Sequence, residues 1–534
     1  MAGIAFAVYL AASVAIFGRG VVTHPTTTVV GDPGADKTLY MWAFEWWPHA
    51  VVRGHNPLDV TVAWVPHGFD LGLGTAGGGL ALLVWPVTAL GGPVLSYNVL
   101  ALAAPALGAT TTFVLAREVT DQFLPALVAG WVFGFSSYET GHLLGHLPLA
   151  FTVLVPLVPY LVLRRYRGTL GRQTFVALLA LVLAAQFMIV TQIFFSLVLL
   201  GVVAAALAWL LWRDAVLPTI FESAAATTLA ALLVSPVLVY AAVSHAAAPA
   251  RSPFAESADV LNFLVPTHRT WLHTAGTDAV AARFTGTGAE LGAYLGLPFL
   301  VLVALAVRRN RLFLVLLALA AAVLSLGTRV KVAGTVVGIG PWTVLARLPL
   351  VGSALPVRLT LYTSLFAALL VALALADKLS PMRVALAAIG IVATLPNLQL
   401  PTWHSPVPDP AFTLPRGVTA LVLPYGPAGW SMLWQANAHF RYRIVGGHFA
   451  LRVTPQERAW RDVYTEMNDG RLTPRRLRAF LDVHGVTWIV VAPGTRPDAR
   501  RLVRVVARAP GCADGDAVVY RVDPRSHDCR SQTN

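Results

Sequence analysis

Long apolar runs separated by short, arginine-containing loops fill the chain up to about residue 396. Such runs are typical of membrane-crossing helices, which need roughly 20 apolar residues, and they lack the alternation of a half-buried strand. Eleven runs fit this description: Ala2–Phe17, Val94–Ala116, Leu124–Phe135, Leu147–Leu163, Phe175–Val190, Ile193–Trp212, Leu217–Val243, Leu291–Val307, Leu312–Leu326, Leu359–Ala376 and Val384–Leu395. The pattern therefore predicts a polytopic α-helical membrane protein.

The pattern changes in the last 138 residues, 397–534. Three short apolar runs there have the length of buried strands: Val418–Leu423, Val486–Val491 and Ala517–Val522. Thr454 with Glu457 fits a helix capping box, and Thr473 followed by Pro474 is typical of a helix start. We therefore predict a transmembrane domain over residues 1–396 and an α/β domain over 397–534.

Composition and charge add an orientation to this picture. Apolar residues make up 56% of the chain and charged residues only 12%, which excludes a water-soluble protein with a single core. The basic loops Arg164–Arg167 and Arg308–Arg311, and the pair Lys378 and Arg383, belong in the cytoplasm by the positive-inside rule. We expect a multi-pass plasma-membrane protein with a cytoplasmic N-terminus, an outer loop over residues 18–93 with interfacial helices, and an extracytoplasmic tail.

This orientation requires that the glycine-rich segment Thr75–Leu90 does not cross the membrane. We interpret it as re-entrant or as lying in the interface. The tail carries 18 arginines, no lysine and 11 acidic residues, so an anionic lipid or acidic glycan is a candidate partner, and its outer position argues against nucleic acid. Arginine usage of this kind also reflects a GC-rich coding sequence. Both cysteines, Cys512 and Cys529, lie in the tail, either bonded or reduced.

The first candidate chemistry lies just beyond the first helix, where Asp32 and Asp36 flank a Pro-Gly turn in the segment GDPGAD. A carboxylate near apolar aromatic surface gains a tendency to accept protons, which suits a general base. The alternative is a turn that merely begins an interfacial helix. The aromatic run Trp42–Trp47 that follows is typical of the belt at a membrane interface, more than of sugar stacking.

A second motif, SYETGHLLGH, contains Glu139, His142 and His146. In one helix these residues share a face at spacings of three and seven. Carboxylate and imidazole are the ordinary ligands of divalent metals, so a metal or a pyrophosphate-like group could bind here. A polar cavity lining and a solvated loop are the alternatives, and both glycines of the motif weaken a helix.

Basic groups in the later outer loops complete the candidate site. His268 and Arg269 lie in the segment PTHRTW, Glu290 precedes the eighth helix, and Arg358 lies in LPVR at the mouth of the tenth. Arginine at membrane depth needs a partner, and either a lipid phosphate or snorkelling to the interface provides one. Nucleotide-binding P-loops, zinc-protease and serine-hydrolase motifs do not occur in a workable context.

In combination these features resemble the GT-C superfamily of membrane glycosyltransferases, which take sugars from polyprenyl-phosphate donors. The chain is also similar to actinobacterial-type membrane proteins with GDPGAD, PTHRTW, LPVR and LPYGPAGWSMLWQ segments. The resemblance implies that Asp32 is the base that deprotonates a glycan, lipid or protein acceptor, assisted by Asp36 or Glu139 directly or through Mg²⁺ or Mn²⁺. It implies that Arg358, with His268 or Arg269, holds the donor phosphate. The other predicted substrate-binding residues are His142, His146 and Glu290.

One departure from that family concerns the second motif. Many such enzymes have an aspartate or paired acids there, whereas this sequence has Glu139 with two histidines, so the role of the motif and any metal stay open. Two other functions are consistent with the frame: a transporter of lipid-linked glycans and a non-catalytic scaffold of envelope assembly. The early outer Asp32 favours the enzyme, and the absence of a convincing internal repeat counts against the transporter.

Overall fold

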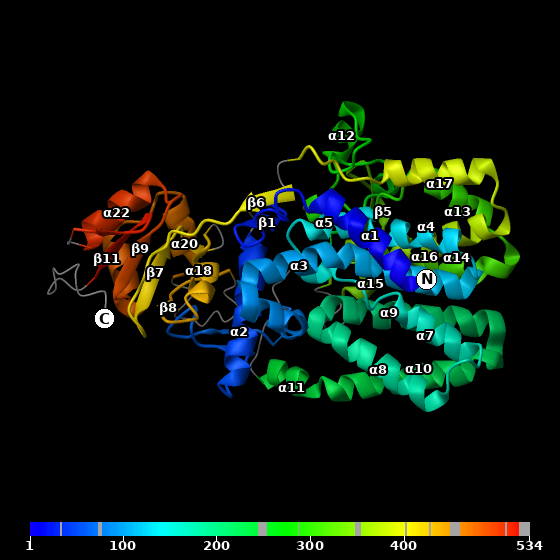
Figure 1. Cartoon of the computed structure of the whole chain (residues 1–534), viewed down its shortest axis with the longest axis horizontal. Coiled ribbons are helices and arrows are strands. Elements are labelled where there is room, and N and C mark those ends of the chain that lie inside the picture. The colour runs from blue at the N-terminus through cyan, green and yellow to red at the C-terminus, as the bar shows by residue number, and fades with distance from the viewer. Residues whose placement is uncertain are drawn as a thin grey trace.

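The computed structural model describes ten stretches of the chain, residues 1–32, 35–72, 77–243, 254–286, 288–347, 354–400, 403–426, 429–448, 460–507 and 510–522. A bundle of apolar helices forms one part of the molecule, and a sheet with flanking helices forms the other (Figure 1). Helix α2 (Ala35–Val52) runs across the direction of the bundle helices, between the two parts (Figure 1).

The bundle helices follow the apolar runs of the sequence. They are α1 (Ala2–Phe17), α3 (Gly78–Thr120), α4 (Phe123–Gly134), α7 (Leu157–Tyr166), α8 (Arg172–Ile189), α9 (Thr191–Trp212), α10 (Leu217–Leu233), α11 (Ser235–Val243), α13 (Leu297–Ala306), α14 (Leu312–Ser325), α16 (Thr360–Asp377) and α17 (Pro381–Ala393). Helix α16 is apolar on all sides and buried along most of its length, so it forms the centre of the bundle.

Shorter elements connect these helices. They are α5 (Ser137–Leu143), α6 (Leu147–Ala150), α12 (Ala275–Ala281), α15 (Trp342–Leu345), the 3-10 helices η1 (Arg213–Val216), η2 (Val260–Phe263), η3 (Gly288–Glu290), η4 (Arg309–Arg311) and η6 (Pro356–Leu359), and the hairpins β2 (Asp59–Val60) with β3 (Phe69–Asp70) and β4 (Arg329–Val332) with β5 (Thr335–Ile339). Helix α5 and η3 carry residues of the candidate site.

Four helical stretches among the described residues are long and apolar enough to cross a membrane: Gly78–Thr120, Arg172–Ile189, Thr191–Leu233 and Pro356–Asp377. Helices α1, α4, α13 and α17 are apolar but shorter. These lengths and compositions indicate a membrane protein. The eleven crossings and the orientation remain predictions.

Two of the predicted spans are divided, so the prediction of one continuous helix for each was wrong. The run Leu147–Leu163 contains α6 and α7 with turns between them, and Pro156 disfavours helical geometry in the residue before it. The run Leu217–Val243 divides into α10 and α11 at Val234, just before Ser235 and Pro236. A proline cannot donate to the helical hydrogen-bond ladder, which explains both interruptions.

The glycine-rich segment before the second predicted span is helical from Gly78 onward and forms the first part of α3. Gly92 has non-helical dihedrals, φ 80° and ψ 173°, and interrupts the helix before Pro93. Glycine reaches a positive φ without a Cβ clash, so the interruption falls where the sequence permits it. Thr75 and Ala76 lie outside the described residues, and the interfacial or re-entrant position of the segment stays a prediction.

The second part of the molecule contains a five-stranded sheet in the order β10-β11-β9-β7-β8. Its strands are β7 (Thr419–Leu423), β8 (Arg443–Ile444), β9 (Trp488–Val491), β10 (Cys512–Asp514) and β11 (Ala517–Arg521). Strand β7 pairs parallel with β8 and β9, and β11 pairs antiparallel with β9 and β10. Strands β7 and β9 are buried at every residue, which their continuous apolar sequence predicts.

The helices of this part are α18 (Ser431–Asn437), α20 (Arg461–Asn468), α21 (Pro474–Val483) and α22 (Pro497–Ala507). The prediction of a helix start at Thr473 is confirmed, because the Thr473 side chain accepts a hydrogen bond from the backbone of Arg476. The three predicted strands correspond to β7, β9 and β11. The predicted cap at Thr454 and Glu457, and Cys529, lie outside the described residues.

The two parts are joined by extensive packing against α2 and the loop that follows it. Trp42 Nε1 donates to Gln435 Oε1 of α18 over 2.9 Å, and Phe440 packs edge-on against Trp42 and Trp46. Trp42, Trp46 and Trp47 are all buried. The prediction that they form a lipid-facing aromatic belt was therefore wrong, because Trp42 and Trp46 pack against the sheet-containing part instead.

Candidate functional site

Asp32 follows a strand that connects the two parts of the molecule. Strand β1 (Thr28–Val30) pairs antiparallel with β6 (His404–Pro406), and the Asp32 N–H donates to the Leu144 carbonyl over 3.1 Å. Gly31 has a φ of 95°, and a Cβ at this position would lie 2.3 Å from the Leu144 oxygen. Only glycine permits so close an approach. The backbone of Asp32 is thus held against the turn between α5 and α6.

Asp36, in the first turn of α2, pairs with two imidazoles. Its Oδ2 lies 3.0 Å from His146 Nε2, and its Oδ1 pairs with Nε2 of His448, which comes from the sheet-containing part. Burial on its own would raise the pKa of Asp36, but the two imidazoles hold that pKa well below its usual value. Asp36 is therefore an ionised carboxylate that bridges two histidines from distant segments.

Glu290, the last residue of η3, forms the centre of a second group of polar side chains. Arg358 donates to Glu290 Oε1 through Nε over 2.9 Å and through Nη2 over 2.5 Å, and its Nη1 donates to Gln192. His142 Nε2 lies 3.4 Å from the other carboxylate oxygen of Glu290. Burial alone would raise the pKa of Glu290, but the guanidinium and the imidazole lower it well below its usual value.

Helix α5 links the two groups. The rings of His142 and His146 are 5.9 Å apart in an edge-to-face arrangement. His142 Nδ1 lies 2.9 Å from the Tyr138 carbonyl, which is its hydrogen-bond acceptor. Burial lowers the pKa of His142, an effect that Glu290 partly offsets. A continuous series of polar groups therefore runs from Asp36 through the two histidines to Glu290 and Arg358.

The shared helical face predicted for Glu139, His142 and His146 is wrong, because α5 ends at Leu143 and His146 caps the separate helix α6. Glu139 instead accepts a hydrogen bond of 2.5 Å from Thr152. Its carboxyl group is 1% exposed. Burial raises the pKa of Glu139 well above its usual value despite that hydrogen bond, so it is a neutral acid apart from the histidines.

Two basic side chains, the buried Lys37 and the half-buried Arg269, lie within electrostatic range of Asp32. Lys37 is 0% exposed, and its Nζ has no hydrogen-bond partner within the ten described stretches. Burial lowers the pKa of Lys37 to about 7, and the charge on Asp32 opposes this effect. Arg269 has a buried Nη1 that is likewise without a partner in the part of the chain described. Burial lowers the pKa of Arg269 too, again against the influence of Asp32.

Arg269 fits in this position because the neighbouring residue, Gly288, has no side chain. A Cβ on Gly288 would lie 2.5 Å from Arg269 Nη2, so the guanidinium lies directly against the backbone of η3. Arg269 also lines a narrow cavity with Ser137 and Thr140 of α5 and its cap region. Its neighbour His268 lies apart, since its side chain is exposed and its carbonyl accepts a hydrogen bond from Asn397.

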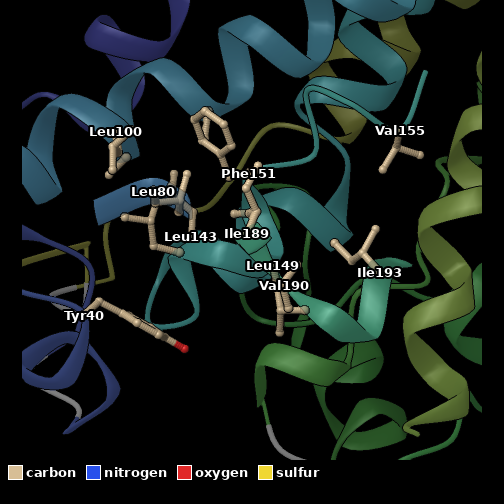
Figure 2. Close-up of a cluster of buried hydrophobic side chains, with 14 of the residues drawn as sticks. Tyr40, Leu80, Leu100, Leu143, Leu149, Phe151, Val155, Ile189, Val190 and Ile193 are labelled. Carbon is tan, nitrogen blue, oxygen red and sulfur yellow. The ribbon is translucent and has the colours of Figure 1, made fainter. Parts of the chain in front are cut away.

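Apolar side chains enclose one flank of the polar series. Figure 2 shows Leu80 and Leu100 of α3 beside Leu143 of α5, with Tyr40 of α2 below them. Tyr40 is 8% exposed. A low-dielectric border of this kind strengthens the electrostatic interactions of the charged groups behind it.

Residue types alone did not reveal every member of the site. His448, Lys37 and Gln192 contact or neighbour the predicted residues but were not predicted. Lys37 adjoins the GDPGAD motif and is one of three lysines in the chain, which is a usable signal. His448 lies hundreds of residues from Asp36, and no spacing could indicate their pairing. No cluster of three or more His, Cys, Asp or Glu able to hold a metal occurs among the residues described.

The chain is similar to known proteins in its three-dimensional structure, but no match is found by sequence. Neither family models nor curated protein sequences match the chain. The cryo-EM structure of the arabinofuranosyltransferase AftD from Mycobacteria matches with a TM-score of 0.60 and 16% identity, over 99% of this chain and 40% of that one. A mutant form of AftD matches with a TM-score of 0.59, 16% identity and coverages of 98% and 42%.

The archaeal oligosaccharyltransferase AglB from Archaeoglobus fulgidus, in complex with an inhibitory peptide and a dolichol-phosphate, matches with a TM-score of 0.49 and 12% identity, over 92% of this chain and 69% of that one. At these identities the likeness to AftD shows the fold alone. Membership of the GT-C superfamily remains a prediction. The chain spans about two fifths of the length of AftD.

Proposed function

We propose that this chain is a membrane glycosyltransferase that moves a sugar from a polyprenyl-phosphate donor to a glycan, lipid or protein acceptor on the outer face. The observation that carries the proposal is the position of Asp32 near the buried Lys37 and the half-buried Arg269, each of which has a buried N–H donor without an acceptor in the described chain. The fold shared with AftD supports it. A carboxylate near unsatisfied cationic donors suits a reaction in which an acceptor loses a proton and a phosphate leaves.

In the proposed reaction Asp32 takes the proton of the acceptor hydroxyl. The acceptor oxygen forms a bond to the anomeric carbon as the bond between that carbon and the phosphate oxygen breaks. The electron pair of the broken bond stays on the polyprenyl phosphate, and the anomeric configuration inverts. Asp32 suits this role because its backbone is fixed against the turn between α5 and α6.

We assign the donor phosphate to Lys37 and Arg269, because each has a buried N–H donor without an acceptor in the described chain. Charge-assisted hydrogen bonds to phosphate are among the stronger interactions available to such groups. Arg358 remains a candidate, although a phosphate would share it with Glu290 and Gln192. His142, His146 and Glu290 would then hold sugar hydroxyls.

Asp36 is proposed to orient the site through its two imidazole contacts. The proposed step assigns no role to a divalent metal. His268 is proposed to bind substrate at the exposed entrance, where its side chain is available. Glu139 is proposed to act as a neutral hydrogen-bond donor rather than a base.

The test is transfer by the purified full chain in liposomes, supplied with polyprenyl-phosphate sugars of different identity and a mixed acceptor extract. Asp32→Asn should lower the transfer rate by roughly 10²-fold or more, with the fold unaffected. Asp121→Asn is the matched control, because the Asp121 side chain is 98% exposed and lies at the C-terminal end of α3. Full transfer by Asp32→Asn would refute the assignment of the base. Lipid movement across the bilayer without any transfer would favour the transporter.

A further inference from the structure

A second polar cavity lies along α2, well away from the acidic residues at its start. Its volume is about 260 Å³, and it is lined by residues of α2, the first part of α3 and the loop after α18. The residues used below are Glu45, His49, Arg53, Trp85 and His439. At a rise of 1.5 Å per residue, Glu45 to Arg53 lie roughly 14–26 Å along the helix from Asp36. The cavity is therefore separate from the candidate active site.

Three basic side chains, His49, Arg53 and His439, line this cavity together with one carboxylate, Glu45. His439 Nδ1 lies 2.7 Å from Glu45 Oε1, and this ion pair accounts for the acidic group of the lining. Burial and, to a smaller extent, the nearby Arg53, His55 and His439 together lower the pKa of His49 to about 4. Arg53 is thus the one permanent cation among the described residues of the lining, with two imidazoles beside it. An anion in the cavity would pair with Arg53 and accept a hydrogen bond from an imidazole.

The loop that supplies His439 is held in an unusual conformation. His439 and Phe440 both have positive φ values, 48° and 58°, which non-glycine residues seldom adopt. The Phe440 ring packs within 4.6 Å of the His49 ring and 5.4 Å of the Trp46 ring, measured between centroids. Residues in sparsely populated backbone regions persist where packing enforces them, and they gather at ligand-binding sites. Packing of Phe440 therefore holds His439 at the edge of the cavity.

Both helices that line the cavity also carry exposed apolar side chains. They are Val51 and Val52 at the end of α2, and Leu82, Leu83, Trp85 and Leu90 in the first part of α3. Trp85 belongs both to this set and to the cavity lining. Tryptophan and arginine next to aliphatic residues are typical of a membrane interface. A free inorganic anion would not contact these apolar side chains, whereas a lipid with an anionic headgroup would contact both the basic lining of the cavity and the apolar side chains.

We propose that this cavity binds the phosphate headgroup of an anionic bilayer lipid, with the acyl chains lying along the exposed residues of α2 and α3. The site is distinct from the donor site and does not depend on the proposed reaction. Arg53 and His439 hold the headgroup phosphate, and Trp85 lies at the level of the glycerol. Because the cavity lies between α2 and the loop after α18, a bound lipid would fasten the sheet-containing part to the bundle.

The experiment measures lipid binding to the purified full chain in phosphatidylcholine nanodiscs. Phosphatidylglycerol is added and binding is followed by native mass spectrometry and by the unfolding temperature. Arg53→Glu should weaken phosphatidylglycerol binding about 30-fold, because it reverses one charge beside the headgroup. Arg19→Glu is the control, since Arg19 is also exposed and lies outside the cavity. His439→Gln provides a second variant should Arg53→Glu fail to fold.

Selective loss of phosphatidylglycerol binding in Arg53→Glu or His439→Gln, with Arg19→Glu unchanged, supports the proposal. Equal binding by all variants overturns it. Inorganic phosphate at the same concentration distinguishes the sources of the anion. If phosphate alone displaces the lipid and stabilises the protein equally, the cavity is a site for free anions and the lipid assignment is wrong.

Discussion

Replacement of Lys37 by methionine should stabilise the protein and impair donor binding at the same time. Methionine fills a similar volume without a charge, and the Lys37 ammonium is buried without a hydrogen-bond partner in the described chain. The pKa of Lys37 falls from 10.5 to about 7 in the folded protein. Since one pKa unit corresponds to about 1.4 kcal/mol, the protonated lysine destabilises the folded state by about 5 kcal/mol.

The pH dependence follows from the direction of this shift. Below pH 7 Lys37 is protonated in both the folded and the unfolded chain, so the whole destabilisation is present. Between pH 7 and 10.5 the folded protein carries neutral lysine while the unfolded chain is still charged, and the destabilisation falls to about 2 kcal/mol at pH 9. The unfolding temperature of Lys37→Met should exceed that of the wild type, with the larger gap at pH 6.

Donor affinity should change in the opposite direction. Loss of one charge-assisted hydrogen bond to phosphate would weaken binding by about tenfold or more. In the wild type, affinity should fall as the pH rises above 7, because neutral lysine cannot neutralise the phosphate, and Lys37→Met should lack this dependence. The measurements are tryptophan-monitored unfolding from pH 6 to 9 and calorimetric titration with a polyprenyl-phosphate sugar.

Lys331→Met is the matched control. Lys331 is also 0% exposed, but its Nζ donates to the Phe254 carbonyl over 2.8 Å and to Thr285. Its removal should destabilise the protein, because two acceptors lose their donor, and should leave donor affinity unchanged. If the difference in unfolding temperature between Lys37→Met and the wild type does not depend on pH, the conclusion that burial lowers the pKa of Lys37 is wrong. Unchanged donor affinity would refute the phosphate contact.

Three further changes test the geometry of the site. Gly31→Ala should abolish transfer, because the added Cβ would lie 2.3 Å from a backbone oxygen. Gly54→Ala is the control, since Gly54 also has a positive φ but has open space around it. It should cost only about 1–2 kcal/mol of stability in a melting assay and leave transfer intact. Arg358→Ala should destabilise the protein by about 3–5 kcal/mol, because it leaves Glu290 buried without its cation, and Glu290→Ala in the same chain should recover part of this loss in denaturant unfolding. Asp36→Asn should lower the unfolding temperature at pH 7. The difference in unfolding temperature from the wild type should narrow as the pH falls below about 4, because the depressed pKa of Asp36 stabilises the protein only while the carboxylate is ionised. A difference that does not change with pH would contradict the pairing of Asp36 with the imidazoles.

The local sequence determined those helices and strands that consist of continuous apolar residues. Continuous apolar runs became helices such as α9 and α16, and short buried runs became β7 and β9, because burial of apolar surface follows directly from residue type. The start of α21 at Thr473 followed from a capping side chain and an adjacent proline. Prolines at 156 and 236 were visible in the sequence, yet the interruptions near them were not predicted.

The sequence also named the residues around which the site is built, but it did not determine which groups pair. Asp36 and Arg358 are conspicuous as an acid after the first helix and a cation at the mouth of another. Only the fold placed His448 on Asp36 and Glu290 on Arg358. The aromatic run of α2 resembled a lipid belt until packing against Phe440 buried it. Apolar burial can be predicted residue by residue, whereas the partner of a charge depends on which distant segments the tertiary structure brings within a few ångströms.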